Sequence, residues 1–107
     1  MRYRVSADAE RDLDEIFLYW ATRTSLNVAD RLIENITDRF WLIGEHPDAG
    51  RLAEEMGPGV RCFPAGKHLI YYRKTRRTLD ILHVLHGARD QERILRRKRR
   101  SSHPPTL

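Results

Sequence analysis

Apolar residues in the first part of the chain repeat with the period of an α-helix. Leu13, Ile16 and Trp20 follow Ala9 at spacings of +4, +7 and +11, which places all four on one face of a helix. The sequence therefore predicts a helix over residues 7–22, with Ser6 as its N-cap.

A second stripe with the same period begins at Ala29 and ends at Ile43. Ser25 stands at the N-cap position, and Pro47 ends the pattern because proline forces the residue before it out of helical geometry. We predict a helix over residues 26–45, which forms a helical hairpin with the first. Four residues are expected to be buried between this hairpin and a sheet: Leu13, Ile16, Ile36 and Phe40.

The remaining segments show the two-residue period of strands. We predict strands over residues 60–63, 67–73 and 78–86, separated by short turns that favour antiparallel pairing, and a further strand over residues 2–5. Residues 50–58 are predicted to be a loop. The fold class expected is α+β: an N-terminal strand, a helical hairpin, then a three-stranded antiparallel meander, forming one small sheet covered on one face by the two helices.

The last strand is apolar on both faces. Leu79, Ile81 and Leu85 lie on one face of residues 78–86, whereas Leu82 and Val84 lie on the other. One hairpin covers only one face of a sheet, so apolar surface is left over. It is either an interaction site or hidden by sheet twist and the loop 50–58.

Charge is distributed unevenly over the 107 residues. Residues 1–50 hold six arginines and ten acidic residues, a net −4, whereas residues 51–107 carry +9. The second half is therefore expected to attract an anionic partner, either nucleic acid or an acidic protein segment. The basic run in residues 96–100 is either a solvated tail or a nucleic-acid contact.

The chemistry available to the chain is narrow. There is one cysteine, Cys62, expected to be a small buried residue, and no apolar run of the roughly 18 residues that a membrane span needs. The first residues lack an apolar signal core, so we expect a cytoplasmic protein. His83 and His86 point to opposite faces of a strand and cannot share a metal there. No metal, cofactor or catalytic serine is predicted.

A cationic face remains as the candidate site. It could stabilise charge in an RNA-cleaving site, with histidine or tyrosine transferring protons, or cradle an acidic partner. Arg89 either pairs with Asp90 or faces a partner. The binding candidates are Arg61, His68, Tyr72, Arg73, His86 and Arg89.

Several segments, taken in order, resemble a known family. They are residues 6–13 (SADAERDL), 45–47 (EHP), 66–73 (GKHLIYYR) and 81–90 (ILHVLHGARD). This pattern resembles the RelE/ParE toxins of type II toxin–antitoxin modules over residues 2–95. The segment 84–90 is similar to the ParE branch, whose members are associated with inhibition of DNA gyrase.

The resemblance carries expectations about activity. In the RelE-type ribonucleases an arginine stands where this chain has His68, and a catalytic tyrosine falls near Leu95; Arg89 alone is retained. The resemblance therefore implies a ParE-like gyrase inhibitor without catalytic residues, and the alternative is a RelE-like ribosome-dependent mRNA endoribonuclease. The toxin domain is expected to span residues 1–95 and a basic, disordered tail residues 96–107.

The resemblance also implies partners. Toxins of this superfamily are held by the C-terminal segment of an antitoxin, so we expect a ParD-like, ribbon-helix-helix antitoxin in a hetero-oligomer. Operator DNA would be contacted only through that antitoxin, DNA gyrase would be the target, and no membrane is involved. The candidates for an antitoxin groove on the helices are Phe17, Trp20 and Trp41.

Overall fold

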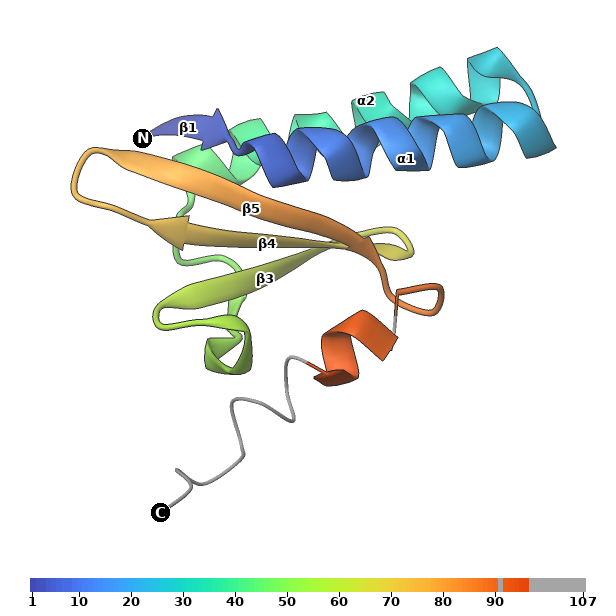
Figure 1. The fold of residues 1–107 in the computed structure, drawn as a ribbon. Coiled ribbons are helices and arrows are strands. Elements are labelled where there is room, and N and C mark those ends of the chain that lie inside the picture. Colours follow the sequence, from blue (N-terminus) through green and yellow to red (C-terminus); the bar gives the residue numbers. More distant parts are fainter. Residues whose placement is uncertain (91, 97–107) are drawn as a thin grey trace.

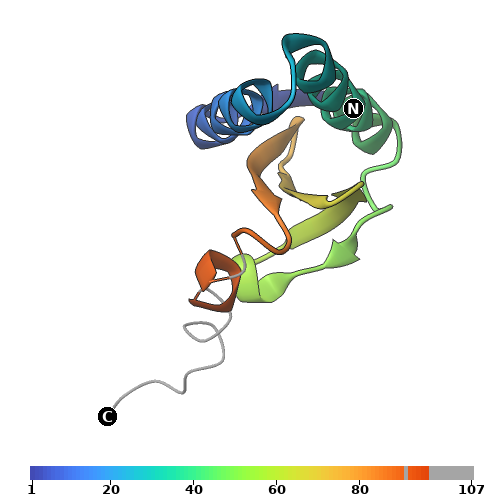
Figure 2. The ribbon, with the colours of Figure 1, turned by 90° about the vertical axis from the view of Figure 1, so that its right-hand side faces the viewer.

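The computed structural model describes residues 1–90 and 92–96. A hairpin of two helices lies over one face of a twisted sheet (Figures 1 and 2). In chain order the elements are β1 (Arg2–Val5), α1 (Ala7–Arg23), α2 (Leu26–Glu45), β2 (Arg51–Leu52), the 3₁₀ helix η1 (Glu54–Met56), β3 (Val60–Ala65), β4 (His68–Lys74) and β5 (Thr78–His86). Residues 92–96 add one helical turn.

Both predicted helices are present and begin at the predicted caps. The Ser6 Oγ accepts a hydrogen bond from the Ala9 amide at 3.0 Å, and the Ser25 Oγ accepts one from the Val28 amide at 3.2 Å. Each cap thus satisfies one of the amides that have no partner within the helix. The α+β class is confirmed.

The sheet has five strands, in the order β1-β5-β4-β3-β2. The predicted meander is present as β3, β4 and β5, but the sheet is mixed, because β1 pairs in parallel with β5. The expected loop 50–58 also contains β2, which pairs with β3. The loop prediction was wrong there because two residues are too few to show a period of two. Parallel strands need a long connection, and here the chain between β1 and β5 passes through both helices and the other three strands.

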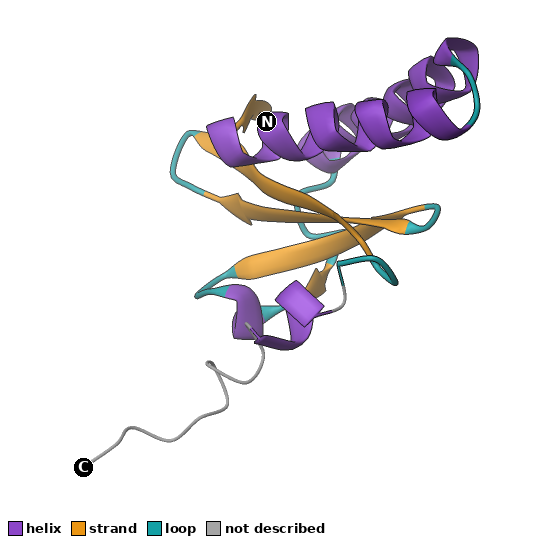
Figure 3. Ribbon diagram, turned by 45° about the vertical axis from the view of Figure 1, so that its right-hand side comes forward, coloured by secondary structure: helices purple, strands orange, loops and turns teal. Residues whose placement is uncertain are grey.

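The main core lies between the helical hairpin and the sheet (Figure 3). Three of the four predicted core residues, Ile16, Ile36 and Phe40, are at most 1% exposed. Leu13 is only partly buried and packs against the edge of this core. The prediction for Leu13 therefore holds in part, and its neighbour Asp12 is the more buried residue, at 6% exposed.

A bulge in β5 reassigns its side chains between the two faces of the sheet. Tyr71 pairs with His83 but Tyr72 pairs with Ile81, so Leu82 is an extra residue in the ladder. The prediction that side chains alternate strictly along β5 was therefore wrong, because an inserted residue shifts every later side chain to the other face. Val84 consequently joins Ile81 in the core beneath the helices.

The opposite face of the sheet carries a second core. Its buried residues come from β3, β4, β5, the segment 51–59 and the turn 92–96: Ala53, Val60, Cys62, Tyr71, Leu85 and Ile94. The segment 50–58 thus hides much of the apolar surface that one hairpin leaves uncovered, as the second alternative expected. Cys62 is buried at 3% exposed, as predicted.

Asp12 on α1 completes the edge of β5. Beyond the last residue of β1, the Ser6 amide donates to the Ile81 carbonyl at 3.0 Å, and the Ser6 hydroxyl donates to the Leu82 carbonyl at 3.0 Å. The Asp12 Oδ2 then accepts from the Val84 amide and lies 3.0 Å from both that nitrogen and the His83 Nδ1. The start of α1 therefore takes the place of a longer β1.

Asp12→Ala is expected to lower the free energy of unfolding by about 2–3 kcal/mol, because it leaves the buried Val84 amide without an acceptor and removes a charge-assisted bond. Asp14→Ala, an exposed position on the same helix, should change stability by less than about 0.5 kcal/mol. Urea unfolding of both variants measures the difference. Equal midpoints for the two variants would show that Asp12 does not support the sheet.

Candidate functional site

Four of the predicted site residues meet at one end of the molecule. Trp20 lies near the end of α1, His68 begins β4, His86 ends β5 and Arg89 follows in the turn. These segments come together beside the tip of the helical hairpin (Figures 1 and 3). His68 and His86 are cross-strand partners, and their rings meet edge to face with centroids 5.1 Å apart.

Tyr19 joins two arginines to this cluster. The guanidinium carbons of Arg23 and Arg89 lie 3.7 and 4.5 Å from the centre of the Tyr19 ring. The same ring contacts Trp20 edge to face at 5.2 Å. A cation over an aromatic face is attracted to the ring and keeps its charge, so this end of the molecule is a cationic surface.

His68 is a buried, neutral imidazole. Its side chain is among the largest that are fully buried, with the residue only 2% exposed. Neither ring nitrogen has a hydrogen-bond partner among the described residues. Burial lowers the pKa of His68 to about 4, assisted by the nearby charges of His86 and Arg89 and opposed by Asp90. At neutral pH the ring therefore offers one N–H donor and one acceptor.

Arg89 is held by local contacts. Its amide donates to the His86 Nδ1 at 2.8 Å, and the His86 amide donates to the Asp90 Oδ2 at 2.7 Å. The Arg89 guanidinium lies 3.8 Å from the Asp90 carboxylate, and its side chain is 30% exposed. Arg89 therefore has the predicted contact with Asp90 and still presents part of its guanidinium to the surface.

The other candidates on the sheet contact the segments between α2 and β3. Tyr72 is 0% exposed; its hydroxyl donates to the Pro47 carbonyl and accepts from the Gly50 amide, both at 2.8 Å. Tyr72 is thus corrected from a binding candidate to a structural residue, because no part of it reaches the surface. Arg61 donates to the Gly50 carbonyl at 2.7 Å, and Arg73 lies 3.4 Å from the Pro58 carbonyl.

The aromatic candidates on the helices do not share one hollow. Trp20 lines a cavity of about 230 Å³ together with Val28, Leu32, Lys67 and His68. Trp41 is 63% exposed and lines a different hollow beside Met1 and Tyr3. Phe17 is partly buried. The structure therefore groups Trp20 with the sheet residues and separates it from Trp41.

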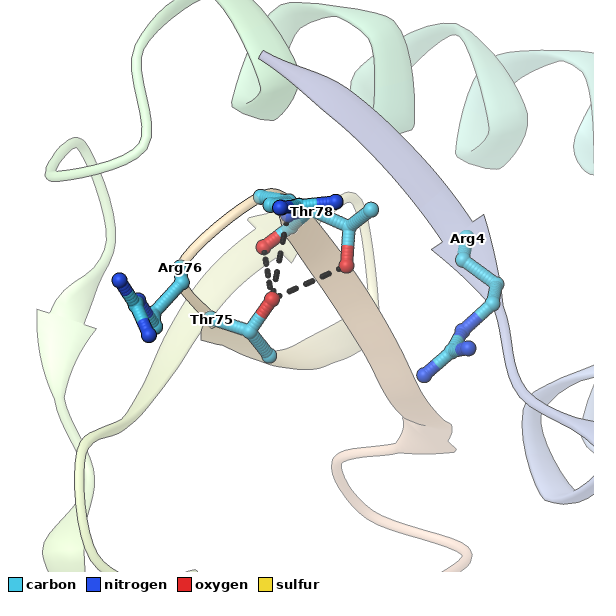
Figure 4. A pocket seen from close by; sticks show the side chains of 5 residues that line it. Arg4, Thr75, Arg76 and Thr78 are labelled. Carbon is cyan, nitrogen blue, oxygen red and sulfur yellow. Dashed lines mark hydrogen bonds between the residues drawn. The ribbon is translucent and has the colours of Figure 1, made fainter.

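A basic corner at the β4–β5 turn was missed in the sequence, where this segment was predicted only as a turn. Arg4, Thr75, Arg76, Arg77 and Thr78 line an open hollow there of about 590 Å³ (Figure 4). The Thr75 hydroxyl donates to the Thr78 carbonyl at 2.9 Å and thereby braces the turn. Arg4 pairs with Asp80 at 3.1 Å. The sequence feature that could have indicated this corner is the pair of adjacent arginines, Arg76 and Arg77, in a tight turn.

The described part of the chain comprises residues 1–90 and 92–96. Within them, no three histidine, cysteine, aspartate or glutamate side chains converge in a way that would hold a metal ion. Neither helix is long and apolar enough to cross a membrane. The predicted tail falls mostly on residues 97–107, which lie outside the described part of the chain.

The helical hairpin over a mixed sheet, with its cationic end, defines a small α+β domain of the RelE/ParE type. The chain belongs to the ParE toxin family of type II toxin–antitoxin systems: the family model described as "ParE toxin of type II toxin-antitoxin system, parDE" matches residues 3–91. The resemblance drawn from the sequence is confirmed, and the chain is a ParE-like type II toxin.

Relatives agree with this assignment. The chain is 32% identical over 95 residues to Toxin ParE1 of Mycobacterium tuberculosis (strain CDC 1551 / Oshkosh), covering 88% of this chain and 97% of that toxin. It is 33% identical over 84 residues to Toxin ParE1 of Caulobacter vibrioides, covering 78% and 86%. A solved structure titled "Chromosomal ParDE TA system from P. aeruginosa" shares the fold, with a TM-score of 0.72 at 21% identity over 80% of this chain and 95% of that one.

Proposed function

We propose that this toxin arrests growth by inhibiting DNA gyrase, as a protein inhibitor rather than an enzyme, and that a ParD-like antitoxin neutralises it. It acts in the cytoplasm, where gyrase and DNA are found. Operator DNA is contacted only through the ribbon-helix-helix half of the antitoxin. Membership of the ParE family supports this proposal.

The observation that carries the non-enzymatic part is the state of His68. RNA cleavage needs groups that take and give protons at the substrate. His68 stands at the position that resembles a ribonuclease arginine, but it is 2% exposed, and its pKa is lowered to about 4. Leu95, near the position of the catalytic tyrosine, cannot titrate. The arginines of this end supply charge but no proton transfer.

The charge of the same end supports an acidic partner. Arg23 and Arg89 both lie over the Tyr19 ring, and Lys67 lies at the nearby β3–β4 turn. Carboxylates of an antitoxin segment would be attracted to these cations. The solved relative from P. aeruginosa is described as a ParDE toxin–antitoxin system, which supports the same kind of partner here.

The purified toxin is expected to inhibit supercoiling by gyrase and to leave ribosome-bound mRNA intact. Arg89→Lys should weaken gyrase inhibition about tenfold, because lysine keeps the charge but loses the planar fork of donors. Arg31→Lys, on the exposed surface of α2, is the matched control and should inhibit like the wild type.

One result would overturn the proposal, and another would overturn only the role given to Arg89. Intact supercoiling together with cleaved mRNA, abolished by His68→Ala, would establish the ribonuclease instead. Equal inhibition by Arg89→Lys and Arg31→Lys would keep gyrase as the target but remove Arg89 from the contact surface.

A further inference from the structure

A small cavity lies between the tip of the helical hairpin and the β3–β4 turn. Trp20, Val28 and Leu32 line it from the helices, and Lys67 and His68 line it from the sheet. Its walls are therefore largely apolar, and three of the lining residues, Trp20, Lys67 and His68, also carry nitrogen atoms. Both elements lie at the same end of the molecule (Figure 1).

Two of the residues that line this cavity carry unpartnered polar atoms. Among the described residues, the Trp20 Nε1 and both ring nitrogens of His68 are buried without a hydrogen-bond partner, and His68 as a whole is 2% exposed. Leaving a buried polar group unpaired is unfavourable, because the group has lost its hydrogen bonds to water. Two neighbouring side chains that carry this cost at one cavity point to a ligand that supplies the missing hydrogen bonds.

The size of the cavity indicates what kind of group fits it. Its volume is about 230 Å³, whereas pockets that enclose a drug-sized molecule measure roughly 300–1,000 Å³. A single large side chain from a protein partner fits this space better. Side chains inserted into such desolvated pockets are the ones that contribute most to binding between proteins.

The charge around the opening indicates the charge of the partner. The Lys67 ammonium forms no ion pair among residues 1–90 and 92–96. Arg23 and Arg89 lie over Tyr19, whose ring contacts that of Trp20. Three cations thus stand near the cavity, so the segment that carries the inserted side chain is acidic.

We propose that this cavity is the anchor pocket for one side chain of the antitoxin's acidic segment, a side chain with an apolar stem and an oxygen at its tip. The oxygen accepts hydrogen bonds from the Trp20 indole and from the N–H of the neutral His68 ring. Carboxylates flanking that side chain pair with Lys67 and Arg89. This inference rests on the proposed antitoxin partner and adds the place and chemistry of its anchor.

Two variants of the full-length toxin test the pocket by different means. Val28→Trp fills the opening from α2, where Val28 is 45% exposed. His68→Leu removes the unpartnered nitrogens. The probe is the purified acidic protein encoded beside the toxin gene, with affinity measured by calorimetry. Asn27→Trp, an exposed neighbour on α2 that does not line the cavity, is the matched control.

Val28→Trp is expected to weaken binding by about tenfold or more, and Asn27→Trp by less than about twofold. His68→Leu should also weaken binding, while raising the melting temperature of the free toxin because no buried nitrogen is left unpaired. In a Trp41→Phe background, the remaining Trp20 fluorescence should shift when the probe binds. A merely structural role for His68 would not produce this combination of weaker binding and higher stability.

The failures of the two proposals are distinguishable. If the wild-type toxin does not bind the probe, the proposed antitoxin partnership fails and the pocket assignment fails with it. If the wild type binds but Val28→Trp and His68→Leu bind equally well, only the pocket assignment is overturned. Self-association that Val28→Trp abolishes, with probe binding intact, would assign the cavity to a second copy of the chain and would also overturn the proposal.

Discussion

Replacing Phe40 with alanine is expected to lower the free energy of unfolding by about 3–5 kcal/mol, the range for truncating a buried aromatic side chain. Phe40 is 1% exposed and lies in the core between the hairpin and the sheet. Its ring also meets that of Tyr3 on β1, with centroids 5.9 Å apart. The truncation therefore opens a cavity and loosens the contact between α2 and β1.

Trp41 is the matched control for Phe40. It is adjacent on α2 and larger, but 63% exposed, so Trp41→Ala should change stability by less than about 0.5 kcal/mol. Urea unfolding followed by far-UV circular dichroism measures both variants. If Trp41→Ala lowers the free energy of unfolding as much as Phe40→Ala does, the buried face of α2 has been assigned incorrectly.

Acidification is expected to destabilise the toxin through His68. Its folded-state pKa of about 4 lies below the ordinary value of 6.5, so between these values the unfolded chain binds more protons than the folded protein. The stability contributed by the neutral ring is complete above the ordinary pKa and is lost as the pH falls toward the folded-state pKa. Because of this pKa shift, the free energy of unfolding is expected to fall by about 2 kcal/mol when the pH is lowered from about 7.5 to about 5.

The effect is isolated by comparing variants across that pH window. His68→Leu removes the titrating group. On acidification, the free energy of unfolding of this variant should therefore fall by about 2 kcal/mol less than that of the wild type. His46→Gln replaces an exposed histidine and should follow the wild-type curve. Parallel urea-stability curves for the wild type and His68→Leu would show that the buried ring does not resist protonation.

The sequence by itself determined the local elements. Helical periodicity and the serine caps located α1 and α2 to within about one residue, because caps and amphipathic stripes act over a few neighbouring positions. The three strands of the meander followed from β-forming residues between short turns. The segments around His68 and Arg89 also carried the family resemblance, since their order along the chain requires no knowledge of contacts.

Only the tertiary structure decided how these elements meet. The parallel pairing of β1 with β5 joins segments more than 70 residues apart, and no local pattern records such a partner. The bulge at Leu82 moved Val84 to the other face because it adds one residue to a period of two. No periodicity in the sequence singles out Asp12, whose carboxylate accepts a hydrogen bond from the Val84 amide only in the folded chain.

The candidate site shows the same division. Its residue types were evident from the sequence, since histidines and arginines gather in the basic half. Their grouping was not evident. Tyr72, Arg61 and Arg73 contact the backbone of the segments between α2 and β3, whereas His68 lines a cavity with Trp20 at the hairpin tip. Sequence spacing fixes the face of a strand on which a side chain lies, but burial and hydrogen bonding depend on what packs against that face, and only the folded chain brings those partners together.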